Sequence, residues 1–325
     1  MKKIFVVLFC AAILPAMNAG AAEPAAKVRR IGFLAEDQSS AADAAILKKF
    51  LTDAGYIDGK TIVIETSNAG GKIEQIDRAA ADLIAKGPDL IVADGVSAGQ
   101  AARRQVARSD THTTPIVIAS RIETIKPTSN MTGATNISPD LGIQRLKLLK
   151  EIAPGITRVA VMWHEVNAIP ANYLRQMRKA AESLGVEIDA RKVKSSGDFQ
   201  DAFAAMVANK DNGLIIEPQL LFAGRLGEIA SLAVKARLPS ISGLEEFPAA
   251  GGLVSYGLTA DEMWRHTVVL IDRIFKQRKP KAGQSAELPA GQPEKFYLTV
   301  NSKTAGVLGL AMPRELLKRA DKIVQ

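Results

Sequence analysis

Cysteine is almost absent from the 325-residue sequence, in which Cys10 is the only one. It lies in an apolar run, residues 4–14, that follows two lysines and is too short to span a bilayer. The small residues from Ala19 to Ala21 come shortly afterwards, and this order is typical of a signal peptide cleaved near Ala21. We therefore expect residues 1–21 to be a signal peptide and the mature chain to be exported to the periplasm. That chain has no cysteine, which excludes disulfides, thiolate metal sites and cysteine nucleophiles.

The sequence is also poor in aromatic residues, at 5%, and it has no second apolar run of membrane-spanning length. The formal charge is +8, or +6 without Lys2 and Lys3, and the basic residues are scattered among acidic ones. A nucleic-acid partner is excluded for an exported chain with few aromatics and no basic stripe. We expect a soluble mature protein with a solvated basic surface.

Motifs for metals and nucleotide cofactors are missing. The three histidines, His112, His164 and His266, lack the spacing of metal ligands. Neither G-x-G-x-x-G nor G-x-x-x-x-G-K-[ST] occurs. The sequence therefore predicts no metal site and no cofactor.

The mature chain alternates short runs of apolar residues with longer helical patterns, in two successive series. In the first series the predicted strands are 30–34, 61–65, 90–93 and 115–119, with helices 41–54, 73–86 and 98–108. In the second the strands are 158–162, 186–190, 213–216 and 239–241, with helices 141–152, 171–184, 199–208 and 225–236. Continuous apolar strands that alternate with helices indicate parallel sheets covered on both faces. The fold class is therefore α/β, with two doubly wound units.

Candidate ligand-binding residues lie in the loops after the strands, because ligands of open α/β sheets bind at the carboxyl ends of the strands. These residues are Glu36, Asp37, Gly95, Val96, Ser97, Ala98, Ser120, Trp163, His164, Asn167, Glu217, Gln219, Gly243 and Glu246. The acids can accept from a ligand ammonium or hydroxyl, or they can be solvated loop residues. Ser97 and the backbone N–H groups beside it can form a helix-terminal site for a carboxylate.

One loop also matches a catalytic pattern. Gly95 to Gly99 reads G-x-S-x-G between a predicted strand and a predicted helix, which is the setting of a nucleophile elbow, with His164 or His266 as nominal partners of Ser97. The segment follows only the third strand, and no oxyanion-hole motif of the HGG type precedes it. A serine esterase is therefore kept as an alternative to a binding protein without catalytic residues.

Five segments of the chain resemble the ABC-transporter substrate-binding proteins related to the tryptophan- and tyrosine-binding proteins. They are residues 30–34, residues 50–60 with the G-Y-x-x-G turn, residues 146–161, residues 250–257 (AGGLVSYG) and residues 295–310. The resemblance implies a type I periplasmic-binding-protein fold. Gly95 to Ala98 resemble the G-T-P-A-A loop of the family. Trp163, His164 and Asn167 resemble its W-N-P segment, and Glu246 aligns with the glutamate of its S-R-E-F loop.

The resemblance also implies how the chain is divided. One lobe consists of residues 27–136 and 258–297, and the other of residues 137–257 and 298–325. The lobes are joined by three crossover segments, near residue 136, residues 256–258 and residue 298, around a central cleft. A ligand bound in the cleft closes the two lobes by a hinge motion.

The function implied is that of a periplasmic solute-binding protein of an ABC importer. It would act as a monomer, bind a small polar metabolite such as an amino acid, and transiently contact an inner-membrane permease. Two alternatives stay open. One is the serine esterase, and the other is a periplasmic sensory or partner-binding protein.

Overall fold

The computed structural model describes residues 28–36, 40–70, 72–109, 113–120, 130–133, 138–165, 172–277, 288, 293 and 295–325. The predicted signal peptide, the site residues Asp37 and Asn167, and His112 lie outside the described residues. Among the helices of the described ranges, none is both long and apolar enough to cross a membrane.

The first sheet has the order β2-β1-β3-β4-β5, and all its strand pairs are parallel. Its strands are β1 (Arg29–Ala35), β2 (Ile62–Asn68), β3 (Leu90–Asp94), β4 (Ile116–Ala119) and β5 (Met131–Gly133). In β3 the residues from Leu90 to Ala93 are all buried, because helices cover both faces of the sheet. This confirms the predicted parallel sheet with continuous apolar strands.

The helices of the first half are α1 (Ser40–Asp53), the 3-10 turn η1 (Ile73–Gln75), α2 (Ile76–Ile84), α3 (Val96–Val106) and α9 (Ala260–Lys276). Successive residues of a strand point to opposite faces. Ile91 and Ala93 accordingly share a core with α2 and α3, whereas Leu90 and Val92 share one with α1 and α9. Helix α9 therefore belongs to the first sheet although more than 100 residues separate it from β5.

The second sheet has the order β12-β11-β10-β9-β8-β6-β7. Its strands are β6 (Arg158–His164), β7 (Glu187–Val193), β8 (Gly213–Ile216), β9 (Ser240–Ser242), β10 (Val254–Gly257), β11 (Tyr297–Asn301) and β12 (Lys322–Val324). Five of the pairs are parallel, but β10 and β11 run antiparallel, with Val254 opposite Val300. The chain leaves this sheet at Gly257, the end of β10, and re-enters it opposite that residue at Tyr297, so β11 runs antiparallel to β10.

The helices of the second half are α4 (Pro139–Ile152), α5 (Tyr173–Ser183), the 3-10 turn η2 (Ser196–Asp198), α6 (Phe199–Ala208), α7 (Leu220–Ala223), α8 (Leu226–Lys235), α10 (Ser302–Leu308) and α11 (Arg314–Arg319). Helices α4 and α5 share a core with Val159 and Val161 of β6, and α6 and α8 share another with Ala160 and Met162. The second sheet is therefore also doubly wound.

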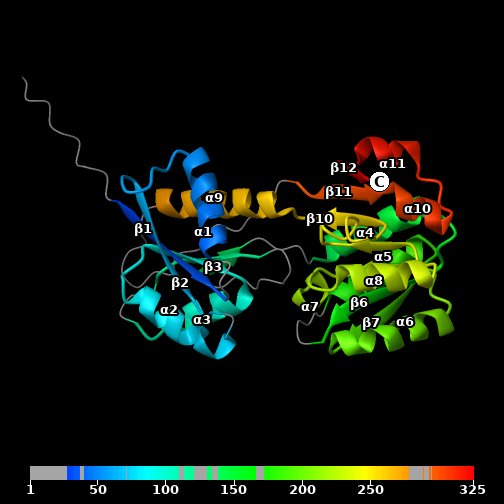
Figure 1. Ribbon diagram of the computed structural model, residues 1–325, viewed down its shortest axis with the longest axis horizontal. Coiled ribbons are helices and arrows are strands. Elements are labelled where there is room, and N and C mark those ends of the chain that lie inside the picture. The colour runs from blue at the N-terminus through cyan, green and yellow to red at the C-terminus, as the bar shows by residue number, and fades with distance from the viewer. Residues whose placement is uncertain are drawn as a thin grey trace, which may run out of the picture.

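Figure 1 shows the two sheets in separate halves of the molecule, with α9 reaching from the first half toward β10 and β11. The chain passes from the first half to the second between β5 and α4, returns between β10 and α9, and passes again between α9 and β11. Tyr256 on β10 and Phe296 just before β11 are in ring contact at 6.1 Å between centroids. The chain therefore leaves the second sheet after β10 and re-enters it at β11 at neighbouring positions, with Gly257 opposite Tyr297.

Candidate functional site

The first group of predicted residues lies at the carboxyl end of the first sheet. Glu36 follows β1, Gly95 follows β3, and Ser120 follows β4 and is buried. Because β1 and β3 are paired, the loops behind them are neighbours. The backbone N–H of Ala98, in the first turn of α3, donates to Glu36 Oε1 at 3.2 Å. The structure thus brings Glu36 together with the Gly95 to Ala98 segment.

Gly95 is required at this contact for two reasons. Its φ is +100°, a conformation that side-chain-bearing residues rarely adopt. A Cβ atom there would also lie 2.7 Å from Glu36 Oε1, well inside van der Waals contact. The glycine therefore lets the Glu36 carboxylate approach the amino terminus of α3, where the helix dipole favours negative charge. The position that we predicted for a ligand carboxylate is occupied by a carboxylate of the protein itself.

The second group lies at the carboxyl end of the second sheet. Trp163 and His164 end β6 and are half-buried, Glu217 and Gln219 follow β8, and Gly243 follows β9. The side-chain oxygen of Gln219 accepts from the backbone N–H of His164. The ring Nε2 of His164 lies 3.1 Å from the carbonyl oxygen of Lys194. The first contact joins the end of β6 to the loop after β8, and the second joins it to the residue that follows β7.

Glu217 is fully buried and already has its partners. Arg145 Nη1 donates to Glu217 Oε2 at 3.1 Å, and the Tyr173 hydroxyl donates to Oε1. The Arg145 Nε also donates to the carbonyl oxygen of Tyr256 at 2.9 Å, so it ties β10 to the same network. Burial raises the pKa of Glu217, and the Arg145 charge and the Tyr173 hydroxyl oppose that rise. Burial and the neighbouring Glu217 raise the pKa of Tyr173 well above its usual value, which keeps the hydroxyl as a donor.

Two glycines make room for this network. A Cβ at Gly243 would lie 2.5 Å from Arg145 Nη2, and one at Gly142 would lie 2.3 Å from the Tyr173 hydroxyl oxygen. Arg145 and Tyr173 were not among the residues singled out from the sequence. A signal for Arg145 was present, because it lies between Leu141 and Leu148 at the helical spacing of an apolar face. A charge on such a face indicates a buried partner.

The loop after β9 reaches the first half of the molecule. Glu245 Oε1 accepts from the backbone N–H of Ala260, the first residue of α9, at 2.9 Å. The neighbouring Glu246 side chain is exposed. Of the two acids, Glu245 therefore contacts the helix of the other half, whereas Glu246 is the more exposed.

The geometry is that of a two-sheet protein with polar strand-end loops in both halves, and comparison with known families agrees. A model of the family described as ABC transporter substrate binding protein matches residues 30–324. The chain belongs to this family. The resemblance found in the sequence is thus confirmed.

Individual relatives of this substrate-binding family member are distant in sequence. The tyrosine-binding protein of Clostridioides difficile (strain R20291) is 22% identical over 220 residues, which are 66% of this chain and 63% of the relative, less than two thirds of its length. The ABC domain from Streptococcus pneumoniae, solved in complex with L-Trp, has a TM-score of 0.73 at 20% identity and covers 92% of this chain and 100% of its own. An arabinose-binding protein from Geobacillus stearothermophilus has a TM-score of 0.60 at 10% identity, with coverages of 88% and 100%. These likenesses confirm the type I periplasmic-binding-protein fold.

The alternative prediction, that this family member is a serine esterase, has little geometric support. Ser97 is in the first turn of α3, and His266 is on α9, so the two residues are on helices that cover opposite faces of the first sheet. His164 belongs to the second sheet. Within the described part of the chain, no group of three or more His, Cys, Asp or Glu residues is placed to hold a metal ion. The polar residues at the two carboxyl edges are suited to hydrogen bonding of a ligand.

Proposed function

We propose that this chain is the periplasmic receptor of an ABC importer and that it binds a small polar metabolite between two lobes. The lobes are residues 27–136 with 258–297, and residues 137–257 with 298–325. The observation that carries the proposal is the pair of doubly wound sheets, each with polar residues at its carboxyl ends, joined by three passages of the chain. Ligands bind at such edges, and a ligand that touches both lobes stabilises the closed form.

The receptor acts as a monomer and has no catalytic step. Its partner besides the ligand is a permease in the inner membrane, which distinguishes the closed form from the open one. The leader that takes the chain to the periplasm is residues 1–21, cleaved near Ala21. This part of the proposal rests on the sequence pattern of a charged start, an apolar run and small residues.

The ligand that we propose is an α-amino acid or another amine-bearing metabolite. Glu217 is neutralised by Arg145, so an ammonium group has two other acids to bind, Glu36 and Glu246. Glu36 is half-buried beside α3, and its second carboxylate oxygen can accept from an ammonium in that less polar setting. The amino acids named for the two relatives, tyrosine and tryptophan, carry such a group.

A thermal-shift panel tests the proposal. The mature protein is screened against amino acids, sugars, nucleosides and organic acids, with tyramine and tryptamine as carboxylate-free amines. A ligand that binds the folded state stabilises it by mass action. We expect shifts with amine-bearing compounds, and loss of at least about tenfold in affinity, or 1.4 kcal/mol, in Glu36→Gln.

The matched control is Glu182→Gln, an exposed glutamate on α5 whose replacement should leave the shift unchanged. Shifts with sugars alone would contradict the proposed amine-bearing ligand but would still support a receptor function. A flat panel with folded, ligand-free protein would reject the receptor and favour a partner-binding protein.

A further inference from the structure

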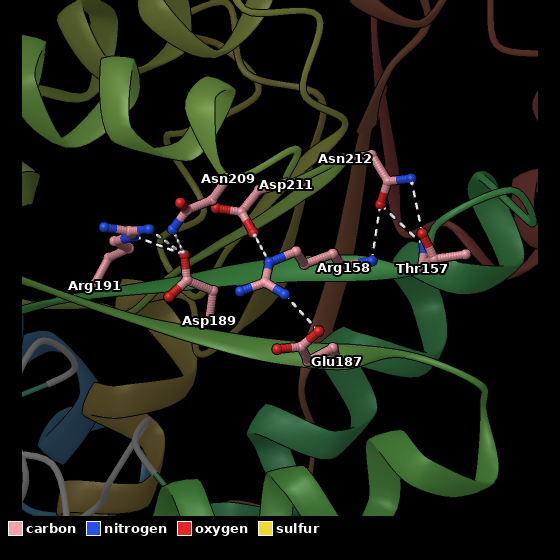
Figure 2. A network of polar contacts seen from close by, with 8 residues as sticks. All are labelled: Thr157, Arg158, Glu187, Asp189, Arg191, Asn209, Asp211 and Asn212. Atoms are coloured by element: carbon pink, nitrogen blue, oxygen red, sulfur yellow. Dashed lines mark hydrogen bonds and ion pairs between the residues drawn. The ribbon is translucent and has the colours of Figure 1, made fainter.

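A cluster of charged side chains lies at the amino-terminal edge of the second sheet, at the opposite end from the candidate site (Figure 2). Asp189 is on β7, and Asp211 is in the turn between α6 and β8. Arg158 begins β6, the strand between them, and its Nε donates to Asp211 Oδ1 at 3.1 Å. Its Nη1 donates to Glu187 at the start of β7. None of these residues is used by the proposed function.

The two aspartates differ in how many donors they have. Asp189 Oδ2 accepts from Arg191 Nε at 2.7 Å and from Asn209 Nδ2 at 3.4 Å. Asp211, whose side chain is fully buried, accepts from Arg158 Nε through Oδ1. Its Oδ2 is buried and, within the described part of the chain, receives no hydrogen bond. The side chains of Asp211 and Asp189 are hydrogen-bond neighbours. Because an ionised carboxylate can only accept, the Oδ2 of Asp211 is satisfied when it carries a proton and donates it to Asp189.

We propose that Asp211 and Asp189 share one proton, and that this proton fastens the edge strand β7 to the turn between α6 and β8. Two ionised carboxylates in contact repel, and one proton between them replaces repulsion with a charge-assisted hydrogen bond. Among the described strands of its sheet, β7 is the last and pairs with β6 alone. A side-chain bond from β7 across to the turn beyond β6 therefore restrains an element that the backbone holds on one side.

The pKa directions agree with this geometry. Burial, followed by the hydrogen bond to Asp189 and its charge, raises the pKa of Asp211 to about 7, and Arg158 and Arg191 oppose the rise. Burial pushes the pKa of Asp189 upward as well, but hydrogen bonds from Asp211, Arg191 and Asn209 leave it below its ordinary value. Glu187 is the remaining acid of the cluster, and β8 contributes no ionisable group.

The sign of the pH dependence follows from the raised pKa. The pKa of an aspartate in the unfolded chain is about 3.9. Between that value and about 7 the folded protein holds a proton that the unfolded chain releases. The stabilisation is complete below about pH 4 and is lost as the pH rises through about 7. The fastening of β7 is therefore strongest in mildly acidic conditions.

Urea unfolding between pH 5 and 8 tests the proposal, with fluorescence as the readout. The chain has two tryptophans, Trp163 on β6 and Trp264 on α9, so a Trp264→Phe background reports on the second half alone. We expect the folding equilibrium constant to fall by up to about 100-fold over this range, the limit for one group with a pKa of about 7. In Asp211→Asn the amide donates to Asp189 at every pH, so this dependence should flatten.

Asp77→Asn is the control, because Asp77 is an exposed carboxylate paired with Arg104 and should leave the wild-type dependence unchanged. A difference between Asp211→Asn and wild type of about tenfold or more across the range supports the shared proton, and a smaller one overturns it. If Asp211→Asn does not fold, Asp189→Asn replaces it, because an amide at 189 also removes the need for the proton. A wild-type dependence in Asp189→Asn would likewise overturn the proposal.

Discussion

At the residue scale, the backbone conformation of Gly95 determines where the Glu36 carboxylate can lie. The residue combines a positive φ with the close approach of Glu36 Oε1 to the amino terminus of α3. The carboxylate there both caps the helix and places a negative charge at the edge of the first sheet. The backbone conformation of one residue is thus linked to the charge that a ligand meets.

We expect Gly95→Ala to destabilise the protein by about 1–3 kcal/mol, because alanine is strained at this φ and its Cβ displaces Glu36. Gly55→Ala is the matched control, since its φ is +91° and a Cβ at that position meets no atom within 4 Å. Urea unfolding in a Trp163→Phe background, which leaves buried Trp264 as the reporter of the first half, measures both. Equal losses in the two variants would mean that the Glu36 contact adds nothing to the backbone strain.

Which acids lie at strand ends could be predicted from the sequence, but not what each acid contacts. Glu36 and Glu217 were both expected to meet a ligand, and the contacts seen are with Ala98 and Arg145. The first contact depends on β1 and β3 being neighbours in the sheet, and the second joins residues 72 positions apart. Strand order and distant helix packing decide such contacts, and the local pattern of polar and apolar residues does not contain them.

At the scale of elements, two helices are each followed by a residue other than glycine that has a left-handed backbone conformation. Lys210 after α6 and Arg237 after α8 have φ values of 61° and 51°. In each case the backbone N–H of the next residue donates to a carbonyl oxygen in the last turn of the helix. Asp211 donates to Met206, and Leu238 donates to Ala233. This is the arrangement in which helices commonly place glycine.

Lys210→Gly and Arg237→Gly should therefore each stabilise the protein by about 0.5–1 kcal/mol, since relief of the left-handed strain exceeds the added freedom of the unfolded chain. The control is Lys235→Gly, inside the last turn of α8, which should destabilise by about 1 kcal/mol. Calorimetric melting temperatures of the three variants compare them directly. A loss of stability in both turn variants would show that the lysine and arginine side chains stabilise these turns by more than the strain costs.

The periodicity of apolar residues was sufficient to predict most of the helices and strands. The strands and helices of both series were predicted to within a few residues, because runs of buried apolar residues mark them directly. Periodicity did not predict the antiparallel pairing of β10 with β11, and only the resemblance to the family assigned residues 258–297 to the first lobe. The pairing and the assignment both depend on the path of the chain after it leaves the second sheet. The sequence of a strand does not indicate whether it runs parallel or antiparallel to its neighbour.

At the scale of the whole molecule, Glu245 joins the two halves. It lies in the loop after β9 of the second sheet, and its carboxylate accepts from Ala260 at the start of α9, which packs on the first sheet. Helix α9 keeps its own cap, because Thr259 accepts from the N–H of Glu262 at 3.1 Å. The bond from Glu245 is therefore not needed to form the helix, and it acts on how the first half is held against the second.

We expect Glu245→Ala to reduce stability by about 0.5–1.5 kcal/mol, the net contribution of one hydrogen bond, and to loosen the two halves relative to each other. Small-angle scattering should then give a larger radius of gyration for this variant than for Glu246→Ala, which removes the exposed neighbouring carboxylate. Because the two variants change the same loop by the same chemical group, a difference between them isolates the bond to α9. Equal radii and equal stabilities would mean that the three passages of the chain alone determine how the halves are oriented.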